Sequence, residues 1–234
     1  AEAVVTMVAT PDALDEVLFG PAGAADQLSA GAALIDMSTV GPAAVAAVST
    51  RLPEGVAMLD VPVLGSVSAA ADGTLKLFAG GNAADVERWR PVLERLGPVR
   101  HVGPLGSGAA MKLVANATLG TLMTGLGEAL ALADALGLDQ ASTLEVLSDS
   151  PIGVTAKGKR SRLESGRYPP NFKLELAVKD LVLVTEAART RGLDVPLAGA
   201  ARSWFEAAGQ AGLGPLDYSA VIAHIRGQEA RLPD

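Results

Sequence analysis

The chain has 234 residues, with 19 Lys and Arg against 26 Asp and Glu, which gives a formal net charge of −7. It contains no cysteine and only two histidines, which excludes disulfides, thiolate metal sites, a cysteine nucleophile and a multi-histidine metal centre. The acidic balance argues against a nucleic-acid-binding protein, and no apolar run is long enough for a membrane span. This composition is typical of a cytoplasmic protein without a metal.

Short apolar runs alternate with helical patterns over residues 1–104. Thr10 and Pro11 supply an N-cap and a first-turn proline for a helix near Asp12. Asn82 can cap a later helix, with Asp85 at the capping-box position. Such alternation predicts a mostly parallel sheet with helices packed on it. We expect strands over 4–8, 33–37, 56–59, 74–79 and 99–102.

The pattern changes after residue 104. The stretch 106–137 is apolar with almost no charge, and it predicts a long helix that is buried by other helices or by a partner chain. Asp217 is the candidate cap of the last helix. We therefore predict an α/β domain over 1–104 and an all-α domain over 105–234. Further helices are expected over 139–149, 156–166, 174–191, 196–211 and 217–227.

Two hydroxyl side chains, Ser38 and Thr39, follow the second expected strand and precede a helix. In an open α/β sheet, ligands bind beyond the carboxyl ends of the strands, where helix N-termini present free N–H groups. These hydroxyls can contact a nicotinamide ribose or a phosphate. Ordinary helix capping is the alternative interpretation, and the motif taken alone favours it.

The segment 60–66 ends the third strand and continues through a turn that contains proline, glycine and serine. Backbone N–H groups exposed in such a turn can hold a carboxylate. The alternative is a strand-to-strand loop that needs Gly65 for its backbone angles, and spacing alone favours this alternative.

The start of the long helix resembles a dinucleotide fingerprint but lacks its third glycine. Gly106 and Gly108 follow a strand, yet the third glycine position falls on Met111, whose side chain would crowd the helix against the strand. Along the helix, Gly108, Lys112 and Asn116 recur at i, i+4 and i+8, which places them on one face.

A lysine on an otherwise uncharged helix needs an explanation, because desolvating an ammonium group is costly. Partial burial lowers the pKa of a lysine and lets it exchange protons near neutral pH, so Lys112 is a candidate acid and base. Asn116, one turn further on, can orient a substrate oxygen or the ammonium. The alternative is a lysine that extends to solvent, with an asparagine beside it.

Two further groups are less informative. Lys179-Asp180 lies in a mostly apolar helix and is either a second cation for the same site or a local surface pair, which the sequence alone favours. His101 and His224 have no carboxylate or serine at a telling spacing, which argues against a hydrolytic triad.

Together these segments resemble the β-hydroxyacid dehydrogenase family, whose members include 3-hydroxyisobutyrate dehydrogenases and glyoxylate/succinic semialdehyde reductases. The matching segments keep their order over essentially the whole chain. They are Thr6-Met7-Val8 with Pro11, Asp36-Met37-Ser38-Thr39, Asp60-Val61-Pro62-Val63-Leu64-Gly65-Ser66, Gly73-Thr74-Leu75, Gly80-Gly81, Gly103-Pro104-Leu105-Gly106-Ser107-Gly108, Lys112, Asn116, Lys179-Asp180-Leu181 and Asp217-Tyr218-Ser219.

The resemblance implies an NAD- or NADP-dependent oxidoreductase, with NADP slightly favoured, that interconverts a small hydroxyacid or related alcohol and its aldehyde or ketoacid. It implies a partial Rossmann-type parallel sheet domain, a 6-phosphogluconate dehydrogenase-like helical domain and a homodimer built around the long interdomain helix. Lys112 matches the catalytic lysine and Asn116 its partner, while Lys179 matches a lysine near substrate and nicotinamide. The other implied contacts are Val8, Ala9, Ser38 and Thr39 for the cofactor, and Leu64, Gly65 and Ser66 for the substrate.

Two features depart from the family pattern. Residues 1–8 look like a strand from midway through the sheet domain, without the glycine-rich phosphate loop. The alternatives are a fragment, a truncated gene product, or one part of a complete protein whose start is absent from this sequence. Leu64 stands where these dehydrogenases usually carry a serine, which favours a less polar substrate. An imine reductase of the same fold and a non-catalytic dimeric scaffold are the alternative functions.

Overall fold

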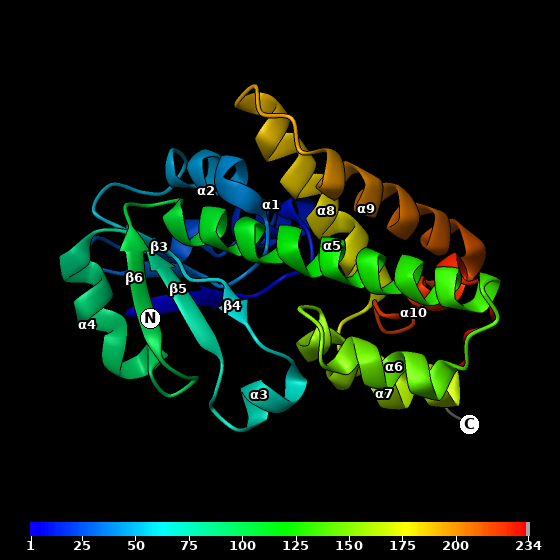
Figure 1. The fold of residues 1–234 in the computed structure, drawn as a ribbon. Helices are drawn as coiled ribbons and strands as arrows, with labels where there is room; N and C mark the ends of the chain where they lie inside the picture. The colour runs from blue at the N-terminus through cyan, green and yellow to red at the C-terminus, as the bar shows by residue number, and fades with distance from the viewer. Residues whose placement is uncertain (233–234) are drawn as a thin grey trace. The chain divides into compact units, whose positions relative to one another are not determined.

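The computed structural model describes residues 1–232 (Figure 1). The chain forms two compact units, residues 1–115 and the residues from 116 onward, and the division falls inside the long helix α5 (Ser107–Ala135). In the described residues, every helix is too short or too polar to cross a membrane.

The first unit contains a mixed sheet in which most strands run parallel, as the sequence predicts. The three parallel strands β1, β2 and β3 lie side by side, and β5 then pairs antiparallel with β3 through Asp60 and Gly80. β4 pairs antiparallel with β5, whereas β6 pairs parallel with it. The strands are β1 (Ala3–Thr6), β2 (Ala33–Asp36), β3 (Ala57–Asp60), β4 (Val63–Leu64), β5 (Lys76–Gly80) and β6 (Val99–Gly103).

Helices cover both faces of this sheet. Successive side chains of a strand point to opposite faces, so Leu34 packs in the cluster with α1 and α2, while Ile35 packs in the cluster with Trp89 of α4 (Figure 1). The helices are α1 (Pro11–Phe19), η1 (Ala25–Gln27), α2 (Gly41–Ser49), α3 (Val67–Ala71) and α4 (Ala83–Leu93). The expected caps are confirmed: Thr10 accepts the N–H of Ala13, and Asn82 accepts that of Ala84.

The second unit is helical, which confirms the predicted change of class. Its core gathers apolar side chains from α5, α8, α9 and α10, among them Leu126, Leu181, Phe205 and Ile222. The helices after α5 are α6 (Gln140–Ser148), α7 (Gly153–Ser165), α8 (Leu174–Thr190), α9 (Pro196–Ala208), the π-helical turn η2 (Gly209–Leu213) and α10 (Ala220–Ile225).

One expected cap in this unit is wrong. The N-cap of α10 is Ser219, which makes no side-chain capping bond, and the helix begins at Ala220 rather than at 217. The carboxylate of Asp217 is fully buried and accepts hydrogen bonds from the Lys159 ammonium and the Ser219 hydroxyl. Asp217 therefore connects α7 to the segment before α10 instead of capping the helix.

Candidate active site

The ends of β1 and β2 are joined by a short chain of hydrogen bonds. The Thr6 hydroxyl donates to Asp36 Oδ1 at 2.9 Å, and the Ser38 N–H donates to the same oxygen at 3.2 Å. The Ser38 Oγ accepts the N–H of Val8 at 2.9 Å. The N-cap of α2 is Val40, so the capping interpretation of Ser38 is wrong. Ser38 instead fixes the turn that leaves β1.

These bonds bring the expected cofactor residues to one edge of the sheet. Val8 and Ala9 follow β1, Ser38 and Thr39 follow β2, and the two strands are parallel neighbours. Ser38 is buried, Val8 and Thr39 are half-buried and Ala9 is exposed. The carboxyl ends of adjacent parallel strands are where open α/β sheets hold nucleotides. The predicted cofactor contacts therefore lie together at this edge.

The segment after β4 needs a glycine for its backbone angles, as the sequence predicts. Leu64 pairs with Lys76 across β4 and β5, and its side chain is half-buried. Gly65 has a φ of +148°, where a Cβ would lie 2.6 Å from a methyl group of Leu75. Ser66 Oγ is 2.9 Å from Ser68 Oγ. The structural need for glycine is thus confirmed, and a role in binding substrate stays a prediction.

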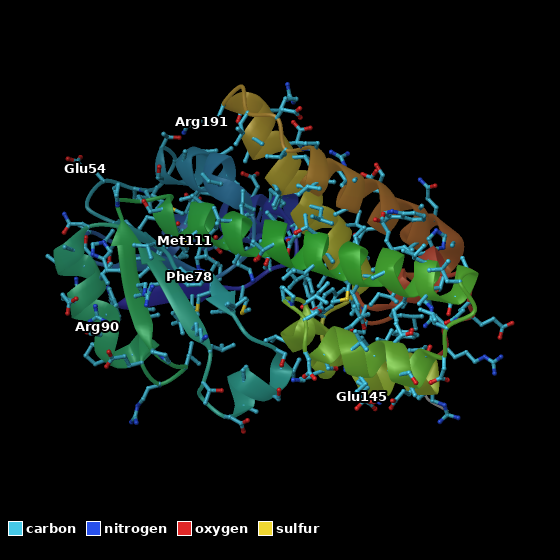
Figure 2. All side chains as sticks on the ribbon, in the orientation of Figure 1. Glu54, Phe78, Arg90, Met111, Glu145 and Arg191 are labelled. Carbon is cyan, nitrogen blue, oxygen red and sulfur yellow. The ribbon has the colours of Figure 1, made fainter. Side chains whose placement is uncertain are left out.

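Lys112 and Asn116 lie on the single continuous helix α5, four residues apart and therefore on one side of it. Met111, which Figure 2 labels, immediately precedes the lysine. Lys112 is half-buried, and Asn116 is only 3% exposed. A buried amide of this kind needs a specific partner.

Asp180 is that partner, and it organises the site in the second unit. The Asn116 Nδ2 donates to Asp180 Oδ2 at 2.6 Å, while the Lys179 Nζ lies 2.7 Å from Asp180 Oδ1. The side chains of Asp180 and Lys179 are 5% and 20% exposed, so their interpretation as a surface pair is wrong. A carboxylate accepts only, so the amide nitrogen of Asn116 faces it and the amide oxygen points elsewhere, as an acceptor for an ammonium or a hydroxyl.

A narrow pocket adjoins this group. It is walled by α5, α8 and the segment before α8, and its lining residues are Asn116, Leu119, Gly120, Phe172, Ala177, Asp180 and Leu181. Neither Asp180 nor Phe172 was predicted from the sequence as a site residue. The separation of Asp180 from Asn116 by 64 residues explains why no local pattern reveals their bond.

Two family models match the two halves of the chain. The NAD-binding domain of 6-phosphogluconate dehydrogenase matches residues 1–103, and the model described as NAD-binding of NADP-dependent 3-hydroxyisobutyrate dehydrogenase matches residues 106–225. The chain belongs to the β-hydroxyacid dehydrogenase family. It is an NAD(P)-dependent hydroxyacid dehydrogenase or reductase.

Relatives with named activities support this membership. Glyoxylate/succinic semialdehyde reductase 1 of Arabidopsis thaliana is 33% identical over 229 residues, which cover 95% of this chain and 78% of that protein. The 3-sulfolactaldehyde reductase of Escherichia coli K12 is 34% identical over 235 residues, which cover 97% of this chain and 77% of that protein.

Solved structures agree with the fold. The Mycobacterium tuberculosis 3-hydroxyisobutyrate dehydrogenase determined with L-serine superposes with a TM-score of 0.85 at 29% identity, covering 97% of this chain and 80% of that one. An imine reductase from Myxococcus stipitatus reaches a TM-score of 0.58 at 22% identity, which shows a shared fold alone; it covers 96% of this chain and 80% of that one.

A substitution of Asp180 tests whether its bond to Asn116 contributes to turnover. Asp180→Asn replaces one acceptor oxygen by a donor, which removes the charged partner of Asn116 and Lys179. We expect kcat to fall roughly 10- to 100-fold, the equivalent of one lost charge-assisted hydrogen bond. Steady-state kinetics would measure this change. The control is Asp194→Asn, an exposed aspartate of the same unit. An unchanged kcat in Asp180→Asn would show that the bond to Asn116 does not contribute to turnover.

Proposed function

We propose that this enzyme interconverts a small hydroxyacid or related alcohol and its aldehyde or ketoacid, with Lys112 as general acid and base. The observation that carries the proposal is the placement of Lys112 on α5, one turn before an asparagine whose orientation Asp180 determines. The nicotinamide cofactor, when bound, supplies or accepts the hydride.

The protein moves the proton. In the reducing direction, the Lys112 ammonium donates a proton to the alkoxide oxygen as it forms; in the oxidising direction, the neutral amine removes it from the hydroxyl. The Asn116 amide oxygen accepts a hydrogen bond from the ammonium or the substrate hydroxyl and so holds the donor in line. Lys179, held by Asp180, supplies a second positive charge for an anionic substrate and for the cofactor.

The cofactor contacts are assigned to Val8, Ala9, Ser38, Thr39 and Lys179. The assignment is supported for the first four residues because they lie together at the carboxyl ends of β1 and β2. We favour NADP slightly over NAD, because one of the two family models is described for an NADP-dependent enzyme.

The substrate contacts are assigned to Leu64, Gly65 and Ser66, together with Lys112, Asn116 and Lys179. The names of the relatives include reductases of glyoxylate, succinic semialdehyde and 3-sulfolactaldehyde, which indicates a small carbonyl compound as the substrate class. The half-buried apolar side chain of Leu64 favours a substrate that is less polar near this segment.

A fluorescence titration with NADPH and NADH, followed by turnover assays, tests the proposal. We expect saturable binding of NADPH and a higher kcat/KM for succinic semialdehyde than for a cyclic imine. Binding of neither cofactor would contradict the proposal for this chain, and faster turnover of the imine would favour imine reduction.

We also propose that the enzyme is a cytoplasmic homodimer that forms through its helical unit and binds neither nucleic acid nor membranes. Apolar side chains of Leu122, Leu132 and Leu136 on one side of α5 and just beyond its end are 44%, 61% and 66% exposed. A second copy of the chain would remove this apolar surface from water. Sedimentation equilibrium measures the expected twofold mass.

A further inference from the structure

Asp60 ends β3 and has no part in the proposed chemistry, yet its carboxylate is 1% exposed and fully engaged. Oδ1 accepts the N–H of Gly106 at 2.8 Å, and Oδ2 accepts the N–H of Ala109 at 2.6 Å. Both donors belong to the first turn of α5 or to the residue before it. A strand thus binds the start of a helix with a charged side chain.

This contact supplies two hydrogen-bond acceptors at the start of α5. The first N–H groups of a helix have no partner within the helix, and α5 has no acidic residue in its first turn. The Ser107 N–H donates to the carbonyl of Pro104, and the first bond of the α-helical pattern runs from Ala110 to Gly106. Asp60 accepts two further amides of this turn, those of Gly106 and Ala109.

Two glycines allow the carboxylate to come this close. A Cβ on Gly108 would lie 2.3 Å from the carbonyl oxygens of both Asp60 and Phe78, the latter on β5 and labelled in Figure 2. A Cβ on Gly80 would lie 2.3 Å from Asp60 Oδ1. The glycine that begins the Gly108, Lys112 and Asn116 series is therefore needed for packing of α5 against β3 and β5.

Asp36 is the titratable neighbour of Asp60, since the two residues pair across β2 and β3. Burial raises the pKa of both carboxyls. One oxygen of Asp36 has no hydrogen-bond partner, whereas both oxygens of Asp60 accept amides. The two amides that Asp60 accepts therefore favour its charged form. On β5, the neighbouring Phe78 and Gly80 are uncharged.

We infer that Asp60 is a positioning residue for Lys112. It holds the first turn of α5 against the sheet, and its negative charge offsets the positive N-terminal end of the helix dipole. Lys112 lies three residues beyond Ala109, in the second turn of α5 and next to the turn that Asp60 binds. The inference rests on the proposed function, because it assumes that Lys112 exchanges the proton.

The test is Asp60→Asn in the full chain with cofactor and substrate bound. The asparagine side chain has one acceptor oxygen, whereas the backbone N–H groups of Gly106 and Ala109 need one each. We therefore expect the start of α5 to shift. We expect kcat to fall roughly 10- to 100-fold while KM for the cofactor changes less than about threefold. The matched control is Asp85→Asn, an aspartate in the first turn of α4 that is remote in sequence from α5, and its kinetics should match those of the wild type.

The pH profile of kcat/KM distinguishes this electrostatic role from a purely structural one. A nearby negative charge favours the ammonium form, so its removal should move the Lys112-dependent midpoint of kcat/KM to lower pH by about half a unit to one unit. Ser107→Asp places a second carboxylate in the first turn and should move the midpoint to higher pH, while Ser107→Asn should not.

Each outcome decides the matter. A folded Asp60→Asn variant with the wild-type kcat and pH profile overturns the inference. If that variant does not fold, an unshifted profile in Ser107→Asp overturns it instead. Failure of the proposed function has a different signature, because Lys112→Ala would then remain active whatever Asp60 does.

Discussion

Replacing Lys112 by alanine should lower kcat by roughly 10²- to 10⁴-fold, the range that a positioned general acid or base contributes. Cofactor affinity should stay within about threefold of the wild type, because the residues assigned to the cofactor lie at the ends of β1 and β2 and on α8. Steady-state turnover of succinic semialdehyde and a fluorescence titration with NADPH measure the two quantities separately.

Lys112→Arg distinguishes proton transfer from simple charge. Arginine keeps the positive charge but does not release its proton at accessible pH, so this variant should be nearly as inactive as the alanine variant. Lys157→Ala is the matched surface control, since the Lys157 side chain is 64% exposed, and its kinetics should be unchanged. Wild-type kcat in Lys112→Ala would refute the role of the lysine.

Local features of the fold were predictable because their partners are close in sequence. Thr10 and Asn82 cap their helices through amides two or three residues away, which is a contact that a short motif contains. The nearly uncharged stretch 106–137 likewise predicts α5 from its own composition. The alternation of strands and helices predicted the parallel part of the sheet.

The antiparallel part of the sheet was not predictable in the same way. β4 has only two residues and α3 has five, which is too short for a hydrophobic period to appear. Their presence reverses the chain after Pro62, so that β5 runs antiparallel to β3. The reversal is visible only in the antiparallel pairings of β5 with β3 and β4.

The shared helix face of Lys112 and Asn116 was predictable from the sequence, but the contacts that support these residues were not. Lys112 and Asn116 share a helix face, which the spacing predicts. The bonds from Asn116 to Asp180 and from Ala109 to Asp60 cross 64 and 49 residues, and no sequence pattern links such pairs. In both cases the missed residue is a buried carboxylate that meets a donor from another element. A buried aspartate at the end of a strand or in an apolar helix is the signal that would have found them.

Asp217→Asn should lower the free energy of unfolding by about 3–5 kcal/mol, the loss typical of a buried ion pair that loses one partner. The Asp217 side chain is fully buried, and its Oδ1 lies 2.9 Å from the Lys159 Nζ and 3.7 Å from the Arg162 Nε. Its Oδ2 accepts the N–H groups of Asn171 and Phe172 at 3.3 and 3.4 Å. Loss of the charge leaves two largely buried cations without their counter-charge.

The direction of the pKa shift of Asp217 predicts how the free energy of unfolding depends on pH. Burial raises the pKa of Asp217, but the Ser219 hydroxyl and the Lys159 ammonium together outweigh it, so the pKa lies below its ordinary value of 3.8. Burial lowers the pKa of Lys159, and Asp217 opposes that shift. The stabilisation is therefore complete above about pH 4 and is lost as the pH falls through the lowered pKa of the folded state.

Urea unfolding at several pH values measures both effects, with Asp149→Asn as the control. Asp149, the C-cap of α6, pairs with Lys157 of α7 at 3.7 Å, but their side chains are 85% and 64% exposed, so loss of this pair should cost less than about 1 kcal/mol. The difference between the wild type and Asp217→Asn should be largest near neutral pH and shrink below about pH 4. An equal cost for both variants would show that burial of the Asp217 pair contributes nothing.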